Sequence, residues 1–194
     1  MNPKIEKTFT LYAAVHFQDK FIINLYDFSV SMEVETDSVK EQNIAMDRIK
    51  YFLYDCLENA VFVHEKEHKV IEKYMNSGIN VCTVPDEPYD QIIASVLLLK
   101  FKAITEGRLI ITDIQLTSKL SDNVRFWLEM DVIEEAYGSS GWWIEPNTLI
   151  NTNTKINKKD KIVKLFKNTE WNEVGLSWKP KTSQTSEIVF TMDT

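Results

Sequence analysis

The chain begins with two stretches in which apolar and polar residues alternate. Residues 9–17 and 21–35 are rich in β-branched and aromatic side chains, and every second residue from Phe28 to Val34 is apolar. Alternation with this period is typical of strands that have one buried face and one face in water. The pattern therefore predicts two antiparallel strands, followed by a polar turn at residues 36–42.

Two helices are predicted in the next part of the chain. Residues 47–58 repeat apolar side chains at the spacing of one helix face. Residues 65–76 are short and highly charged, and they predict a second, solvated helix. We expect short extended segments before and after this second helix, at residues 61–63 and 80–84.

A third helix is predicted at residues 91–105, where apolar side chains surround most of the helix circumference. Such a helix should be buried on two sides or lie at an interface. Glu106-Gly107 ends it, and two strands are expected at residues 108–118 and 124–133. The element order ββααββ predicts an α+β fold: an antiparallel four-stranded sheet with helices on one face.

The character of the chain changes after residue 133, which predicts an α+β domain at residues 1–133 and an extended C-terminal appendage at 134–194. Residues 151–181 hold eight lysines against three acidic residues, although the whole chain carries a net charge of −7. Either this region is a solvated basic appendage, or it docks on an acidic partner or on the acidic body of a neighbouring subunit. Residues 162–166 and 187–192 are expected as short strands or extended arms.

The bulk composition limits the classes of protein. With 194 residues, 44% hydrophobic and 26% charged, the chain has the composition of an ordinary globular protein. The net negative charge does not favour nucleic acid as a partner. No apolar run approaches the roughly 20 residues of a membrane span, the first residues do not form a signal peptide, and the two cysteines make no disulfide framework. We therefore expect a cytoplasmic protein without a membrane partner.

Several short motifs resemble one known family. Residues 9–16, F-T-L-Y-A-A-V-H, are similar to an F-x-F-x-A-A-H opening strand. Residues 44–50, I-A-M-D-R-I-K, and 88–94, P-Y-D-Q-I-I-A, are similar to two helix openings. Together with the element order over residues 7–133, these motifs resemble the tunnelling-fold (T-fold) proteins, specifically the 6-pyruvoyl- and 6-carboxy-tetrahydropterin synthases. The resemblance implies a homo-oligomer that closes its sheets into a barrel, with a purine- or pterin-like ring bound at a subunit interface.

The residues that carry this family's chemistry are mostly missing. The family holds a catalytic zinc through three histidines, and Asn24 and Tyr26 stand where two of them would be. His16 is displaced by one residue from the position of the third, and no cysteine stands at the position of the catalytic thiol. The resemblance therefore implies a divergent member without a metal, a cofactor or a catalytic residue. His64, Gln115 and His16 remain as candidate ligand-binding residues.

Two functions follow from these observations. The first is a divergent T-fold-like homo-oligomer that binds a purine- or pterin-like ligand at a subunit interface without zinc. The second is a non-catalytic interaction or assembly protein, of a kind that a virus or phage could encode, which binds a protein partner through its C-terminal arm. The arm's candidate interaction residues are Trp142, Trp143, Trp171 and Trp178. The sequence does not assign an enzymatic activity.

Overall fold

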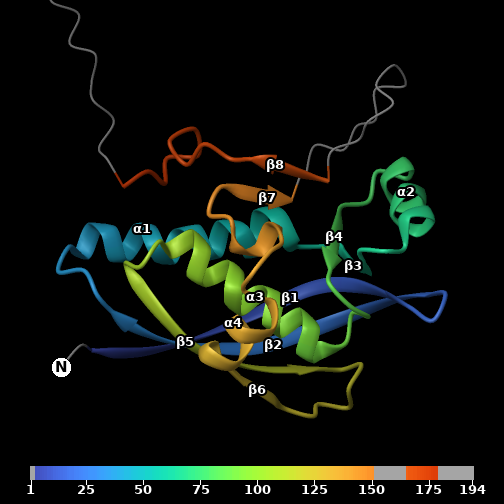
Figure 1. Ribbon diagram of the computed structural model, residues 1–194, viewed down its shortest axis with the longest axis horizontal. Helices are drawn as coiled ribbons and strands as arrows, with labels where there is room; N and C mark the ends of the chain where they lie inside the picture. The colour runs from blue at the N-terminus through green and yellow to red at the C-terminus, as the bar shows by residue number, and fades with distance from the viewer. Residues whose placement is uncertain (1–2, 151–164, 179–194) are drawn as a thin grey trace, which may run out of the picture.

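The computed structural model describes residues 3–150 and 165–178 (Figure 1). The expected extended segment at residues 187–192 lies outside this range, as do residues 162–164. The elements in chain order are β1 Lys4–Phe17, β2 Lys20–Val34, α1 Val39–Lys50 with its continuation as the π-helix η1 Tyr51–Leu57, β3 Val61–His64, α2 His68–Asn76, β4 Val81–Val84, α3 Asp90–Thr105, β5 Leu109–Ser118, β6 Phe126–Glu129, α4 Met130–Tyr137, the 3-10 helix η2 Trp142–Ile144, β7 Thr148–Ile150 and β8 Phe166–Asn168.

The two alternating stretches form one long antiparallel hairpin, as predicted. β1 pairs with β2 from Lys4 opposite Glu33 to Phe17 opposite Lys20. The turn residues Gln18 and Asp19 both have positive φ, 50° and 59°, which suits the tight two-residue turns that match strand twist. The alternating apolar residues from Phe28 to Val34 face the core, as do Phe9, Leu11 and Val15, so the period of two has placed these residues correctly.

The predicted antiparallel four-stranded sheet is wrong. The sheet is curled and mixed, with six strands in the order β4-β3-β1-β2-β5-β6. β3 runs parallel to β1, and β4 runs parallel to β3. Each of these two strands has only four residues, nearly all buried, and the α2 crossover connects them. Short apolar runs of this kind are typical of parallel strands buried on both faces, and the sequence pattern indicated only extended segments there.

The expectation that the helices cover one face of the sheet is also wrong. α1, α3 and α4 cover one face, together with the main hydrophobic core. α2 packs on the opposite face at the β3–β4 end, where a small second cluster contains Ala14, Val61, Ile71 and Tyr74. Parallel crossovers must leave the sheet plane, and this one leaves it on the side away from α1 and α3.

Among the element boundaries that differ from the sequence prediction, two change the type of secondary structure. Residues 36–42 are not all turn, because α1 begins at Val39 and the Ser38 hydroxyl accepts a hydrogen bond from the backbone N–H of Glu41 at 3.3 Å. The strand expected at residues 124–133 ends at Glu129, where α4 begins. Its last residues place apolar side chains at a spacing that a helix and a strand can both use, so periodicity alone did not separate the two.

The described part of the C-terminal region packs on the body of the molecule. β7 and β8 form a two-stranded sheet on the outer side of α1 and η1 (Figure 1). Trp142, Trp143, Leu149, Ile150 and Trp171 are buried in the same hydrophobic cluster as β1 and α3. Residues 134–150 and 165–178 therefore complete the core rather than extend away from it.

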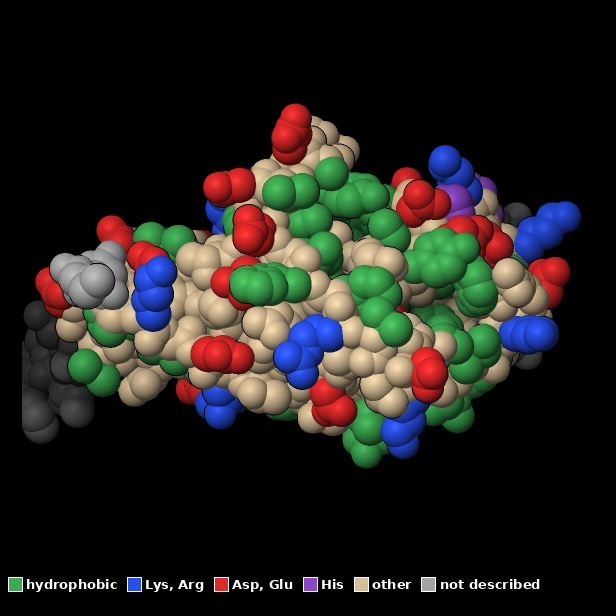
Figure 2. Space-filling model, turned by 90° about the horizontal axis from the view of Figure 1, so that it is seen from below, with side chains coloured by type: hydrophobic (Ala, Val, Ile, Leu, Met, Phe, Trp, Pro, Cys, Tyr) green, Lys and Arg blue, Asp and Glu red, His purple; other side chains and the backbone are tan. Residues whose placement is uncertain are grey.

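The face of the sheet turned away from α1 and α3 remains largely open (Figure 2). Charged side chains are spread across it, with groups of apolar side chains between them. Tyr12, Ile23 and Trp127 are exposed, and strand alternation places them on this face. Among the described residues, no helix is both long and apolar enough to cross a membrane.

One buried amino group fixes the chain after α4 to the core. Lys100 on α3 is fully buried, and its Nζ donates to the carbonyl oxygens of Trp142 at 3.1 Å, Glu145 at 2.6 Å and Thr148 at 2.5 Å. Burial lowers the pKa of Lys100 to about 7, and the negative charge of Glu145 partly opposes this effect.

We expect Lys100 to make the protein more stable as the pH rises from about 7 toward 10.5, the ordinary pKa of lysine. In this window the unfolded chain binds the additional proton, so raising the pH favours the folded state. Because each pKa unit corresponds to about 1.4 kcal/mol, the gain relative to Lys100→Met is at most about 5 kcal/mol. Urea unfolding of both proteins at several pH values measures this difference.

Lys73→Met provides the control, because Lys73 is exposed on α2. The difference in free energy of unfolding between Lys73→Met and the parent protein should change little with pH. Parallel pH profiles for the parent protein and Lys100→Met would contradict the prediction.

Candidate functional site

A groove of about 730 Å³ lies between the C-terminal half of α3, strand β5 and the β6–α4 junction. This volume is in the range of sites that bind ligands or side chains of a partner. The apolar part of the groove lining comprises Leu99, Ala103, Leu109, Ile110, Ile111, Met130 and Ile144. We call this site the acidic groove, because of the charges described next.

The polar lining of the acidic groove is mostly anionic. It contains five carboxylates, Glu106, Asp113, Glu129, Asp131 and Glu134, and one lysine, Lys102. Lys102 is paired with Glu134, and Asp113 accepts hydrogen bonds from Ser31 and Thr112 at 2.9 and 3.0 Å.

Glu129 and Asp131 differ from the other carboxylates of the acidic groove. Among the described residues, neither forms an ion pair or a hydrogen bond with another side chain. Both are exposed at the start of α4, where the helix dipole stabilises negative charge. This local stabilisation explains the two carboxylates without a ligand, but it also keeps two uncompensated charges beside an apolar surface.

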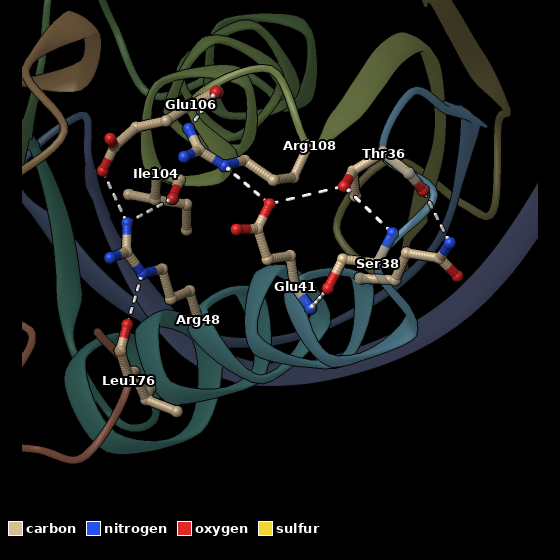
Figure 3. Close-up of polar contacts among 9 residues, drawn as sticks. Thr36, Ser38, Glu41, Arg48, Ile104, Glu106, Arg108 and Leu176 are labelled. Carbon is tan, nitrogen blue, oxygen red and sulfur yellow. Dashed lines mark hydrogen bonds and ion pairs between the residues drawn. The ribbon is translucent and has the colours of Figure 1, made fainter. Parts of the chain in front are cut away.

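A second polar arrangement shares Glu106 with the acidic groove (Figure 3). Arg48 on α1 is buried with a side-chain exposure of 2%, and its Nη1 bonds the Glu106 carboxylate at 2.6 Å and the Ile104 carbonyl at 3.0 Å. Its Nε donates to the Leu176 carbonyl at 2.9 Å. Burial lowers the pKa of Arg48, and the bond to Glu106 counteracts this effect.

Two tryptophans of the C-terminal region enclose the same guanidinium. The Arg48 Cζ atom lies 4.4 Å from the ring centroid of Trp171 and 3.7 Å from that of Trp178. Contacts of this geometry are favourable cation–π interactions. Arg108 lies 4.5 Å from Trp178 and pairs with Glu41 at 3.5 Å. We call Arg48, Glu106, Trp171 and Trp178 the arginine cage.

The turn between α3 and β5 joins the acidic groove to the arginine cage. Glu106 has a left-handed backbone with φ of 47°, and Gly107 has φ of 77°. Glycine takes this conformation without strain, which lets the chain reverse within two residues. Glu106 lines the acidic groove while its carboxylate bonds Arg48, so one side chain belongs to both sites.

The four tryptophans predicted as interaction residues all contact their own chain. Trp142 and Trp143 are buried, and their indole N–H groups donate to the carbonyls of Thr83 and Tyr137, each at 3.0 Å. Trp171 and Trp178 lie against the guanidinium of Arg48. A further role in binding a partner stays a prediction.

The three predicted ligand-binding residues do not line one site. His16 on β1 lies under α2, with Nδ1 2.9 Å from the Tyr74 hydroxyl and Nε2 3.5 Å from the Glu67 carboxylate. His64 is close in space on neighbouring β3, but strand alternation gives it the opposite face. Gln115 on β5 is opposite Ser29 on β2, which is in turn opposite Thr8 on β1. Thr8 lies eight residues before His16 on the same strand, a separation of roughly 26 Å. Their ligand-binding role stays a prediction.

Asn24 and Tyr26, which occupy the resembled family's metal positions, are buried side by side on β2. The Asn24 amide oxygen accepts backbone hydrogen bonds from Leu25 at 3.0 Å and Leu120 at 3.2 Å. Burial raises the pKa of the Tyr26 hydroxyl well above its usual value, and the nearby Asn24 side chain opposes this effect. Among the described residues, no three His, Cys, Asp or Glu side chains are grouped as a metal site requires.

The cysteines are structural in the described molecule. Cys56 and Cys82 are both buried as free thiols. Burial raises the pKa of Cys56 to about 12 and also raises the pKa of Cys82. Because the thiolate is the nucleophile, neither residue is arranged for covalent catalysis.

Sequence reasoning singled out Trp171 and Trp178 of the arginine cage, but it missed Arg48 and the carboxylates of the acidic groove. Glu129 and Asp131 fell inside a predicted strand, so their place at a helix start was not recognised. Arg48 gave a signal that was not used. It lies three residues after Ala45 and four before Phe52, on the apolar face of its helix. A charged residue in that position indicates a buried ion pair.

Comparison with known proteins adds no functional assignment. No family model matches the chain, and no curated protein matches it. Among solved structures, the chain is similar to an uncharacterized protein from Wolinella succinogenes, with 11% identity and a TM-score of 0.47. The similarity covers 67% of this chain and 99% of that chain. A likeness at this level carries no argument about function, so the function rests on the geometry of this molecule.

We expect Arg48→Met to lower the free energy of unfolding by about 3–5 kcal/mol, because it leaves the Glu106 carboxylate partly buried without its cation. The variant Arg48→Met/Glu106→Gln should recover part of this loss, since no unpaired charge remains. Urea unfolding followed by tryptophan fluorescence measures both values.

The matched control is Arg108→Met. Arg108 also contacts Trp178, but its side chain is 29% exposed against 2% for Arg48, so the loss should be within about 1 kcal/mol. Equal losses for the Arg48 and Arg108 variants would contradict the proposed importance of the arginine cage.

Proposed function

We propose that this protein is a non-catalytic interaction module whose acidic groove binds a lysine-rich, aliphatic segment of a protein partner. The observation that carries the proposal is the position of Glu129 and Asp131. Both are exposed, neither has an ion pair among the described residues, and both border an apolar surface. A ligand that satisfies the acidic groove must therefore offer a cation close to apolar groups.

Lysine meets this requirement in a single side chain. Its four-carbon stem covers apolar surface while the ammonium stays at the polar rim. Aliphatic neighbours in the same segment would contact the part of the lining formed by Leu99, Ile111 and Met130. The charges would give the complex its orientation and a rapid, salt-sensitive association, while apolar contact would supply most of the affinity.

The chain itself contains a segment with this composition. Residues 151–164 hold five lysines, one aspartate and the aliphatic residues Ile156, Ile162 and Val163. The remaining chain outside residues 151–181 carries the acidic excess. This segment supplies a defined probe for the acidic groove, and a neighbouring copy of the chain could provide it.

Binding of a purine- or pterin-like ring at a subunit interface stays a prediction. It rested on the four-stranded frame that the structure replaces and on His16, His64 and Gln115, which do not line one site. No observation on the described residues favours it over the acidic groove.

We expect a synthetic peptide of residues 151–164 to bind the protein, and binding to weaken as salt increases because exposed charges are screened. In Glu129→Gln/Asp131→Asn, the dissociation constant should rise by about tenfold, since two favourable charge contacts are lost. Fluorescence anisotropy of the labelled peptide measures both effects.

Two variants make the test specific to the acidic groove. Ala103→Phe fills part of the groove without changing its charge and should also weaken binding. Glu72→Gln removes an exposed carboxylate on α2, away from the groove, and should leave binding unchanged. The proposal is wrong if Glu72→Gln weakens binding as much as the double variant, or if a peptide with every lysine replaced by glutamine binds equally well.

A further inference from the structure

Strand β1 has a long stretch of backbone that is paired on one side only. The Pro3 carbonyl accepts from the Val34 N–H on β2, so odd-numbered residues of β1 direct their backbone groups toward β2. On the other side, Tyr12 accepts from the Asn59 N–H and Ala14 donates to the Ala60 carbonyl. Even-numbered residues therefore direct their backbone groups away from β2.

Four even-numbered residues have no partner on this second side. β3 pairs with β1 only at Ala14 and Val15. Within the described part of the chain, the outward N–H and C=O groups of Lys4, Glu6 and Thr8 have no backbone partner, nor do those of Thr10. All four residues are exposed. We call residues 4–10 the open edge, and Figure 1 shows its first residues at the start of the chain, at the lower left.

The two terminal strands of the sheet, β4 and β6, offer much less unpaired backbone for a further strand. On β4, which has four residues, the Thr83 carbonyl is already bonded by the Trp142 indole. β6 also has only four residues, and it passes directly into α4. Short or covered edges do not template further pairing, whereas a long exposed edge does.

Charge complementarity on the open edge favours one arrangement. In an antiparallel pair of identical strands, a two-fold axis through Ile5 places Lys4 of each copy opposite Glu6 of the other. An axis through Lys4, Glu6 or Lys7 instead places like charges opposite each other, which is unfavourable. An axis through Thr8 would bring Lys4 to Tyr12, whose carbonyl is already bonded to Asn59.

We propose that the open edge pairs with the open edge of a second copy of this chain about a two-fold axis at Ile5. Lys4 of each copy would form a hydrogen-bonded backbone pair with Glu6 of the other copy. The two pairs together give four backbone hydrogen bonds. Ile5, already 38% exposed, would meet its own counterpart on the axis. The Lys4 ammonium lies 3.3 Å from the Glu33 carboxylate on β2. In the dimer it would therefore lie between this carboxylate and the Glu6 carboxylate of the second copy.

This pairing would join two six-stranded sheets into one continuous sheet. The interface is short, and it belongs to the class of weak, reversible contacts. It contains no residue that lines the acidic groove, so the dimer and the proposed peptide binding can fail independently.

Sedimentation velocity between about 10 μM and about 1 mM tests the proposal, a range suited to weak association. The parent protein should move from monomer to dimer. Lys4→Glu and Glu6→Lys should each raise the dimer dissociation constant by about tenfold or more, because each variant places two pairs of like charges in contact. An equimolar mixture of the two variants should dimerise again, since the two acidic side chains of the Lys4→Glu copy then face the two basic side chains of the Glu6→Lys copy.

The mixture is also the control for damage to the fold, because two misfolded variants would not restore dimerisation. A parent protein that stays monomeric throughout the range overturns the proposal. Dimerisation that neither variant weakens, or that the mixture does not restore, overturns the assignment to the open edge.

Discussion

The buried guanidinium of Arg48 connects α1 to segments that lie far away in the sequence, as far as Leu176, 128 residues on. It hydrogen-bonds the end of α3 and the turn before β5, and it also bonds the chain after β8. A buried cation is costly unless every donor finds an acceptor, so these segments must be positioned together. The packing of Trp171 and Trp178 on its two sides extends the same constraint to the C-terminal region.

The sequence predicted the elements better than their arrangement. Alternation located the β1–β2 hairpin, and the continuous apolar pattern located α3, because each signal extends over more than ten residues. The four-residue strands β3 and β4 gave no directional signal, and parallel pairing depends on where the α2 crossover places them. The strand expected at residues 124–133 became β6 and α4, since a short apolar run fits both periods.

The residues that the family resemblance suggested for ligand binding, His16, His64 and Gln115, do not line one site, and their role stays a prediction. Motif positions transfer only when the strand order transfers, and β3 joins the sheet here in a parallel arrangement. The acidic groove depends on a helix start at Glu129 and on the left-handed turn at Glu106, neither of which a strand-based reading could locate. Glu106 links the acidic groove to the arginine cage, because its side chain lines the groove and its carboxylate bonds Arg48.

Nuclear magnetic resonance with ¹⁵N-labelled protein and the unlabelled peptide of residues 151–164 tests the central claim most directly, because it reports where the ligand binds. The account predicts chemical-shift changes concentrated in residues 99–113 and 129–138, with smaller changes at the indole N–H groups of Trp171 and Trp178. Changes confined to β1 or α2, or no changes at a saturating peptide concentration, would contradict it.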